Sequence, residues 1–231
     1  MKILINYADK RYEPARKWNT FTGRHIARFD KVYEFHPEDV KSEFAARHSE
    51  ILSHKRGNGL WLWKPYFVNK VLDECSDGDI VFYCDSGSLF KRNINIILEF
   101  LSEDNPLFVC DIPLIESCFT KPLCFEKMGL TEEMYKTSNQ IIATYFCFLA
   151  TPTTRKFIAE WLSLCCDIEL LSPAGFGKHD AITKNYGTSF VAHREDQSIF
   201  SLLCKKYNFL PHRDISQRGL HPETYKSPFY A

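Results

Sequence analysis

The sequence predicts an α/β fold in a single domain, with a central, mainly parallel sheet flanked by helices, and three observations support this. Short runs of β-branched and aromatic residues alternate with segments of helical periodicity through the first two-thirds of the chain. Polar residues follow these runs directly, as in parallel sheets whose strands end at a ligand site. The length, 231 residues, is enough for one sizeable core and short for two independent domains.

Two strands are expected near the N-terminus. Lys2–Tyr7 (KILINY) is a β-rich run that polar residues follow immediately, which is typical of nucleotide-binding α/β folds. Lys31–Phe35 (KVYEF) alternates like a second strand. His36–Asp39 can begin a helix that continues over Val40–Arg47.

A third strand is expected after a loop and a helix. Ser53–Gly59 (SHKRGNG) is a basic, glycine-rich loop, and apolar residues then recur at helical spacing from residue 63 to residue 72. Pro65 suits the first turn of that helix. Ile80–Cys84 is apolar almost throughout, which predicts a strand covered on both faces, and Asp85 ends it abruptly.

The rest of the chain predicts further alternating elements separated by irregular segments. We expect a helix at Ile94–Leu101, a strand at Leu107–Cys110, a short helix at Thr131–Lys136, a strand at Ile141–Thr151, and helices at Pro152–Cys165 and Glu195–Lys206. Ser172–Gly187 contains three glycines and is expected to be a mobile loop. The tail from Tyr207 shows little periodicity and is expected to wrap the surface.

Composition narrows the functional classes. Lys and Arg total 29, as do Asp and Glu, and a formal net charge of zero argues against a nucleic-acid-binding protein. The longest strongly apolar stretch, Ile141–Ala150, is too short to cross a bilayer, and the N-terminus does not resemble a signal peptide. Nine scattered cysteines without a CxxC pair suit a reducing compartment. The sequence therefore predicts a cytoplasmic protein without a transmembrane segment.

Asp85 is the first candidate for a metal site. A carboxylate at the end of a buried strand is costly unless its charge is neutralised. A divalent cation between Asp85 and a diphosphate would do so, because hard cations prefer oxygen ligands. Ser86 adds a hydroxyl, and Gly87 permits close approach of the backbone. The alternative is that Asp85 only caps a turn, since Asp-Ser-Gly is common turn chemistry.

A second group of candidate residues precedes and opens the last predicted helix. His193–Gln197 contains an imidazole, a guanidinium, two carboxylates and an amide, a set that can bind a metal, sugar hydroxyls and a diphosphate. The alternative is that the acidic residues only complement the helix dipole. Arg56 and Lys64 are candidate cationic partners for phosphate, and Tyr7 could stack on a base. The alternatives are a solvated helix position for Lys64 and a packing role for Tyr7.

Three segments together resemble a known enzyme family. Residues 56–88 (RGNGLWLWKPYFVNKVLDECSDGDIVFYCDSGS) are similar to the nucleotide-sugar segment of glycosyltransferases with the single-domain, Rossmann-like GT-A fold, especially small polysaccharide-building enzymes of bacteria and large viruses. Residues 193–203 (HREDQSIFSLL) resemble the HRxDQS element of those enzymes, and residues 119–130 (FTKPLCFEKMGL) resemble an acceptor-side loop. Gly87 stands where the family's Asp-x-Asp motif has its second Asp, which leaves the other metal ligands open.

The resemblance implies a metal-dependent glycosyltransferase with Mn²⁺ or Mg²⁺ as cofactor. Such an enzyme moves a sugar from a nucleoside-diphosphate sugar, here expected to be UDP-linked, to a hydroxyl of a saccharide or glycan acceptor. Residues from about 1 to 110 would bind the nucleotide sugar, and those from about 111 to 231, with the C-terminal tail, would lie on the acceptor side. Asp196-Gln197 is similar to an element of retaining enzymes, which favours retention; an inverting enzyme would need Asp196 or Glu195 as a base.

These considerations give a set of expected site residues. They are Glu195, Asp196 and Gln197 for catalysis, Tyr7, Arg56, Lys64, Asp85, Ser86, Gly87, His193 and Arg194 for donor binding, Lys121 and Asp111 on the acceptor side, and Asp85 for the metal, with His193 or Asp196 as the next candidate ligand. Two alternatives stay open. One is a metal-dependent phosphoesterase or nucleotide-sugar hydrolase with Asp85, Asp111 and His193 as ligands, and the other is a non-enzymatic sugar- or nucleotide-binding module.

Overall fold

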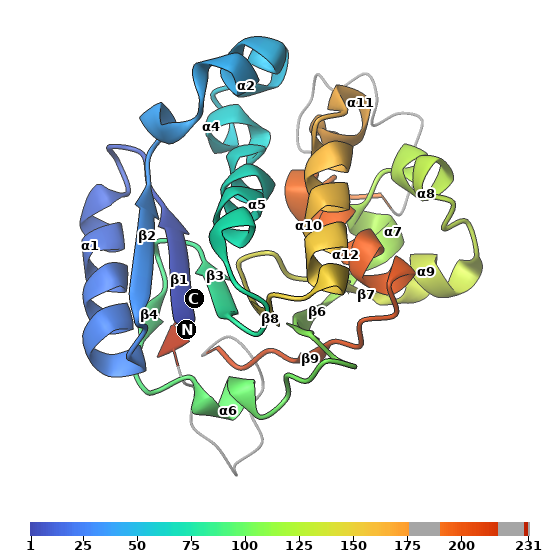
Figure 1. The fold of residues 1–231 in the computed structure, drawn as a ribbon. Coiled ribbons are helices and arrows are strands. Elements are labelled where there is room, and N and C mark those ends of the chain that lie inside the picture. The colour runs from blue at the N-terminus through green and yellow to red at the C-terminus, as the bar shows by residue number, and fades with distance from the viewer. Residues whose placement is uncertain (176–189, 217–228, 231) are drawn as a thin grey trace.

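A computed structural model describes residues 1–175, 190–216 and 229–230 of the chain. Most of the loop expected at Ser172–Gly187, from residue 176 onward, lies outside the described residues, as do residues 217–228 and 231 of the tail. In the described parts a central sheet is covered by helices on both faces (Figure 1).

The central sheet has five strands, four of which run in the same direction. Their spatial order is β2 (Lys31–Phe35), β1 (Lys2–Tyr7), β3 (Ile80–Cys84), β8 (Tyr145–Leu149) and β5 (Leu107–Phe108). β1 pairs in parallel with β2 and with β3, whereas β8 runs antiparallel to both β3 and β5. The register places Tyr7 opposite Phe35 and Ile5 opposite Tyr83. The predicted fold class, a mainly parallel sheet flanked by helices, is confirmed.

Two small sheets extend this core. One has the order β7 (Asn139–Ile141), β6 (Cys110–Ile115) and β9 (His212–Arg213), and the other pairs β10 (Phe229–Tyr230) with β4 (Leu89–Phe90). β6 pairs antiparallel with β7 and parallel with β9, so the start of the tail is held against the chain's middle segment.

The two faces of the sheet bury different clusters. Val81 and Tyr83 of β3 pack in a large cluster with α5 (Trp63–Glu74), α10 (Pro152–Cys165) and α12 (Glu195–Lys206). Phe82 and Cys84 point to the other face and pack in a smaller cluster. That face is covered by α1 (Glu13–Thr22) and a π-helical turn, η1 (Gly23–Ala27). The expectation that β3 is covered on both faces is therefore confirmed.

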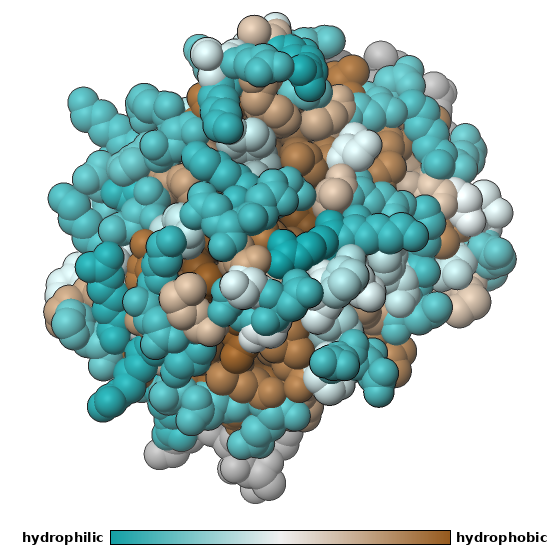
Figure 2. Space-filling view, viewed as in Figure 1, coloured by the Kyte–Doolittle hydropathy of each residue, from teal (hydrophilic) through white to brown (hydrophobic). Residues whose placement is uncertain are grey.

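Short helices fill the connections. They are a 3₁₀ turn η2 (Pro37–Asp39), α2 (Ser42–Arg47), α3 (Ser49–Leu52), α4 (Gly57–Leu60), α6 (Asn95–Leu98), α7 (Glu116–Phe119), α8 (Pro122–Met128), α9 (Glu133–Thr137) and α11 (Ile168–Leu171). Figure 2 shows that the side chains on the viewed face are mostly hydrophilic, with hydrophobic residues recessed among them. All nine cysteines lie in the described parts of the chain as free thiols. Among the described residues, no helix combines the length and the apolar character that crossing a membrane requires.

Several predicted elements match the structure, and others need correction. β1, β2, β3, α10 and α12 have the predicted bounds. The strand predicted at Leu107–Cys110 is divided, because β5 belongs to the central sheet and Cys110 begins β6 in another sheet. The strand predicted at Ile141–Thr151 is likewise divided between β7 and β8 by residues 142–144. The helix predicted at Ile94–Leu101 is limited to α6.

Candidate functional site

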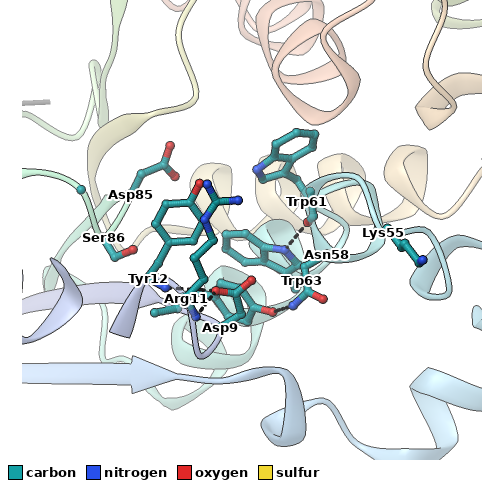
Figure 3. Close-up of a pocket in the computed structure, with 13 residues that line it drawn as sticks. Asp9, Arg11, Tyr12, Lys55, Asn58, Trp61, Trp63, Asp85 and Ser86 are labelled. Carbon is teal, nitrogen blue, oxygen red and sulfur yellow. Dashed lines mark hydrogen bonds between the residues drawn. The ribbon is translucent and has the colours of Figure 1, made fainter. Parts of the chain in front are cut away.

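A cavity of about 440 Å³ lies at the carboxyl ends of β1 and β3. Residues from three segments line it: Tyr7, Ala8, Asp9, Arg11 and Tyr12; Lys55, Gly57, Asn58, Trp61 and Trp63; and Asp85, Ser86 and Gly87. Figure 3 shows Asp85 and Ser86 on one side and Trp61 and Asn58 on the other. This is the position at which parallel α/β sheets collect ligands, so the fold and the cavity indicate the same site.

A left-handed turn forms one wall of this cavity. The five consecutive residues from Gly57 to Trp61 all have positive φ angles, between 52° and 92°. Each non-glycine residue in this conformation costs about 1–2 kcal/mol, so Leu60 and Trp61 are strained. Gly57 is required sterically, because a Cβ atom there would lie 2.2 Å from the Trp61 ring. The turn brings both Asn58 and Trp61 to the cavity.

Tyr7 and Trp63 form an aromatic floor beneath the turn. Their rings stack with centroids 3.7 Å apart, and both side chains are largely buried. The Nδ2 group of Asn58 donates a hydrogen bond to the Tyr7 hydroxyl, and the indole N–H of Trp63 donates to the carbonyl of Gly57 at 2.9 Å. Tyr7 therefore lines the predicted site, with its ring already stacked on Trp63.

The opposite wall, the turn that follows β3, is fixed by buried amides. Asn6 of β1 donates to the Oδ1 atom of Asn19 in α1, at 2.7 Å. Asn19 in turn donates to the carbonyl of Ser88 at 2.8 Å. Asp85 closes the turn, since its carbonyl accepts the Ser88 N–H at 2.9 Å and its own N–H donates to Thr144 at 2.8 Å. Asp85 is thus held at the cavity by its backbone.

The Asp85 side chain is accessible but has protein partners. Its carboxylate is 39% exposed and lines the cavity. The Oδ1 atom accepts a hydrogen bond of 2.6 Å from the hydroxyl of Tyr83 and lies 3.5 Å from Lys64 Nζ. Asp85 therefore does more than cap a turn, because it belongs to a charged network and also faces the cavity.

Lys64 is a buried ammonium shared by two carboxylates. Its Nζ lies 3.0 Å from Asp196 Oδ2 and 3.5 Å from Asp85 Oδ1, and it donates to the carbonyl of Ala143 at 3.0 Å. Lys64 is only 3% exposed. The two carboxylates raise the pKa of Lys64 despite its burial, so it is charged at neutral pH. Lys64 does not line the cavity and lies behind Asp85, where it can act on a ligand only through that carboxylate.

Asp196 has a different environment from Asp85. Only 5% of its side chain is exposed, and burial raises its pKa to about 6, against the opposing effect of Lys64. Its Oδ2 atom forms an ion pair with Lys64. Asp196 is therefore the buried member of the network.

Glu195 joins the first turn of α12 to the glycine-rich loop. Arg56 holds it with two contacts, from Nε to Oε1 at 2.6 Å and from Nη2 to Oε2 at 3.4 Å. The Glu195 backbone has a φ of 43°, a strained value for this residue type. Burial raises the pKa of Glu195 even though Arg56 opposes this. The ion pair thus joins two strained segments, the glycine-rich loop and the start of α12. The sequence predicted that Arg56 binds phosphate, whereas in the structure it pairs with Glu195.

Gln197 fixes the loop between β7 and β8. Its Oε1 atom accepts the Ala143 N–H at 3.3 Å, and its Nε2 group donates to Gln140 Oε1 at 2.9 Å. Since Lys64 binds the carbonyl of the same Ala143, residues 143 and 144 lie between Asp85 and the start of α12. Gln197 therefore positions residues 143 and 144, the loop that lies between Asp85 and α12.

His193 and Lys121 lie side by side in the interior. The Lys121 N–H donates to His193 Nδ1 at 3.4 Å, and Lys121 Nζ donates to the carbonyl of Ser172 at 2.8 Å. Burial and the Lys121 charge hold the pKa of His193 well below its usual range, so the imidazole is neutral. The Arg194 guanidinium stacks over Phe119 at 5.1 Å from the ring centroid. These side chains do not line the cavity with Asp85.

Asp111 belongs to a second cavity of about 320 Å³. It accepts a hydrogen bond of 2.8 Å from Asn139 across β6 and β7. Tyr135, Lys205 and Phe209 are among the other lining residues. The two cavities have no lining residue in common, so Asp111 is not part of the site at Asp85.

The residues at the first cavity fit a divalent cation that is shared with a phosphate-bearing ligand. Among the described residues no group of three or more His, Cys, Asp or Glu side chains is placed to hold a metal, so the ligand set Asp85, Asp111 and His193 is not formed. Mg²⁺ commonly uses only one or two carboxylates and takes its other ligands from substrate phosphates and water. Asp85 is a partly exposed carboxylate of that kind.

Sequence reasoning missed five polar residues at this site, which include Asp9 and Asn58. The other three are Arg11, Tyr12 and Lys55, of which Arg11 and Lys55 are cations. Arg11 follows β1, where the polar run already indicated a ligand site, and Lys55 adjoins Arg56 in the basic loop. The sequence showed that each segment contains more than one cation. It did not show that Arg11 and Lys55 would be the ones that face the cavity.

Of three comparisons with known proteins, only the one with solved structures found a match. No protein-family model matches the sequence, and a search of curated proteins finds no match. Among solved structures, apo mouse xyloside xylosyltransferase 1 aligns with a TM-score of 0.54 over 100% of this chain and 97% of its own, at 10% sequence identity. At this identity the similarity shows the fold, and it confirms the GT-A fold class.

Proposed function

We propose that the protein is a glycosyltransferase that binds a nucleoside-diphosphate sugar in the cavity at the carboxyl ends of β1 and β3. The observation that carries this proposal is the lining of that cavity, where aromatic rings, the cations Arg11 and Lys55, and the carboxylate of Asp85 meet. Rings suit a nucleobase or a sugar face, cations suit phosphates, and a carboxylate suits a bridging metal ion. The similarity of the fold to a xylosyltransferase, and the sequence resemblance to small polysaccharide-building enzymes, support the same class.

The proposed donor arrangement follows the cavity from one wall to the other. The base, expected to be uracil, lies near Tyr7 and Trp61, and Arg11 and Lys55 meet the diphosphate. Asp85 would hold Mn²⁺ or Mg²⁺, and such an ion would offset the charge that develops on the leaving diphosphate. Tyr83 and Lys64 orient the Asp85 carboxylate from behind.

The surroundings of Asp196 and Glu195, the bases expected for an inverting reaction, support a retaining reaction. A base that deprotonates the acceptor must reach its hydroxyl. Asp196 is buried against Lys64, and Glu195 is held by Arg56, so neither is free to do this. In the retaining reaction the bond from the sugar C1 to the phosphate oxygen breaks, a new C1–O bond forms on the same face, and the acceptor proton passes to the leaving diphosphate.

The second half of the chain is proposed to serve the acceptor. Residues from about 111 onward contribute the second cavity with Asp111, and the buried Lys121 fixes the segment before α8. The nucleotide-sugar half then corresponds to residues from about 1 to 110, which supply every lining residue of the first cavity.

The test is release of nucleoside diphosphate from a panel of UDP-sugars, with and without glycan acceptors, in Mn²⁺ and in EDTA. A transferase predicts release that an acceptor stimulates and that EDTA abolishes. Release at a rate indifferent to every acceptor would identify a hydrolase instead. Donor binding without turnover under any condition would identify a binding module.

A further inference from the structure

The segment made up of Tyr12, α1 and η1 exposes an unusual number of large apolar side chains. Tyr12, Trp18, Phe21 and Ile26 are 51%, 62%, 50% and 37% exposed. They account for four of the ten large hydrophobic residues that are exposed in the described parts of the chain, and they fall within fifteen residues. A single exposed apolar residue is ordinary, but a cluster of them marks an interaction site.

The helix is held with this face outward. Asn19, Thr20 and Ala27 are buried on the inner side, and Asn19 bonds to Asn6 and to Ser88. A Cβ atom at Gly23 would lie 2.5 Å from Leu4, so the helix packs closely on β1. The aromatic face is therefore a fixed feature of the surface.

Trp18, Phe21 and His25 form one continuous aromatic strip. Trp18 and Phe21 meet edge to face with ring centroids 5.8 Å apart, and the His25 ring lies 4.6 Å from Phe21. Their spacing of three and four residues is that of neighbours on one helix face.

The same segment concentrates positive charge in a chain whose net charge is zero. Residues 10–28 contain six Lys and Arg side chains and one acidic residue, Glu13. Five of the cations are exposed: Lys10, Arg11, Lys17, Arg24 and Arg28. Lys17 lies 3.5 Å from Glu13 and Arg24 lies 3.9 Å from Glu34, each as a partly exposed pair. The remaining exposed cations leave a basic rim around the aromatic strip.

We infer that this face, residues 10–28 with Trp18 and Phe21 at its centre, binds the surface of an anionic lipid bilayer. Trp and Phe partition into the interface between headgroups and acyl chains, and Lys and Arg are attracted by anionic headgroups. Nucleic acid would also attract the cations, but it offers no apolar layer for Phe21 and Ile26. An amphipathic, basic surface helix suits binding along the bilayer surface rather than crossing it.

The bilayer-binding face adjoins the candidate site, since Arg11 and Tyr12 belong to it and also line the first cavity. Under the proposed transferase function, on which this consequence alone rests, the cavity would open beside the membrane, where a lipid-carried acceptor can reach it. Binding to the bilayer itself does not depend on turnover, so the two proposals can fail separately.

The test is co-sedimentation of the purified chain with phosphatidylcholine vesicles that contain or lack phosphatidylserine. We expect binding to the anionic vesicles that weakens as salt is added. The double variant Trp18→Ala, Phe21→Ala should weaken this binding by about tenfold or more. The free energy gained by burying one large apolar side chain is enough to change an affinity tenfold, and this variant loses two such side chains. Lys17→Gln with Arg24→Gln should weaken it less and should reduce its dependence on salt.

The matched control is Ile115→Ala with Val191→Ala, two exposed apolar residues elsewhere on the surface that line neither cavity. This variant should bind as the wild type does, and circular dichroism should show all variants folded. The inference is overturned if the folded wild type ignores anionic vesicles at low ionic strength, or if the Trp18–Phe21 variant binds normally. It is also overturned if the control weakens binding equally, or if single-stranded oligonucleotides bind this face and vesicles do not compete.

Discussion

Asp85 at the end of β3 and Asp196 in the first turn of α12 share one ammonium group but have opposite surroundings. Asp85 is 39% exposed, lines the cavity and accepts a hydrogen bond from Tyr83. Asp196 is 5% exposed and lies 3.0 Å from Lys64, which it helps to keep charged. In the proposed site the two carboxylates therefore have different roles: Asp85 would meet the ligand, and Asp196 would hold in place the Lys64 ammonium that orients Asp85.

The largest effect on stability is expected from Lys64→Met. This change leaves Asp196 buried without a counter-charge, which should reduce the free energy of unfolding by about 3–5 kcal/mol. Adding Asp196→Asn should recover much of the loss, because the uncompensated charge is then removed. Urea-induced unfolding of the wild type, the two single variants and the double variant measures the coupling free energy between Lys64 and Asp196. Lys127→Met, in an exposed ion pair, is the control and should change little. Strict additivity of the two changes would contradict a shared network.

The largest effect on activity is expected from Asp85→Asn. Loss of the carboxylate that faces the donor should lower turnover by about a hundredfold or more. The melting temperature should stay near that of the wild type, because the side chain is partly exposed. Nucleoside diphosphate release and thermal melting measure the two quantities, with Asp77→Asn on the surface as the control. Turnover within a few-fold of the wild type would remove Asp85 from the site.

A smaller, pH-dependent effect is expected at Asp196. Its pKa is about 6 in the fold against a usual value of 3.8, so folding favours the protonated form. Its contribution to stability is therefore present in full below about pH 4 and is lost as the pH rises through about 6. Asp196→Asn removes this titration, so the unfolding free energy of the variant relative to the wild type should rise by about 2–3 kcal/mol between those limits. Urea unfolding across this range tests the sign, with Asp104→Asn as an exposed control. A pH-independent difference would show that Asp196 does not titrate there.

A modest effect is expected from Tyr83→Phe. The change removes one hydrogen bond to Asp85, worth about 1 kcal/mol, and should lower kcat/KM by about fivefold. Tyr145→Phe is a matched control, since Tyr145 donates a similar buried hydrogen bond to Asp214, a residue that does not line the cavity. Equal losses of kcat/KM in both variants would point to a general effect on the fold.

The smallest effects are expected at Gly87. A Cβ atom there would meet nothing within 4 Å, so Gly87→Ala should leave stability and turnover near those of the wild type. Gly87→Asp restores the Asp-x-Asp spacing and should lower the Mn²⁺ concentration for half-maximal activity by about threefold, because a second carboxylate adds an oxygen ligand. Unchanged Mn²⁺ dependence in a folded Gly87→Asp variant would place the metal away from this turn.

The central strands were predictable because each is a short apolar run bounded by turn residues, and Asp85 was predictable as the polar residue after one of them. No helix was predicted for α1, because its buried face carries Asn19 and Thr20 where the periodicity rule looks for apolar residues. The strand predicted across residues 141–151 was wrong because residues 142–144 turn aside, and the backbone of Ala143 and Thr144 binds Lys64, Gln197 and Asp85. Sequence periodicity does not record such contacts.

The site itself was only partly predictable. The glycines at 57 and 59 were visible, but positive φ angles at Leu60 and Trp61 go against the preference of those residues and arise from tertiary packing. The pairs of Arg56 with Glu195 and of Lys64 with Asp196 join residues more than 130 positions apart. Sequence reasoning therefore selected charged residues that do meet, without showing which ones face the cavity.

The most direct test of the division between Asp85 and Asp196 is calorimetric titration of UDP into the wild type, Asp85→Asn and Asp196→Asn, each with Mn²⁺ and with EDTA. We predict that Mn²⁺ tightens UDP binding to the wild type and to Asp196→Asn, and that this gain is absent in Asp85→Asn. A full Mn²⁺ gain in Asp85→Asn, or its equal loss in folded Asp196→Asn, would contradict the assignment of Asp85 as the carboxylate that meets the ligand.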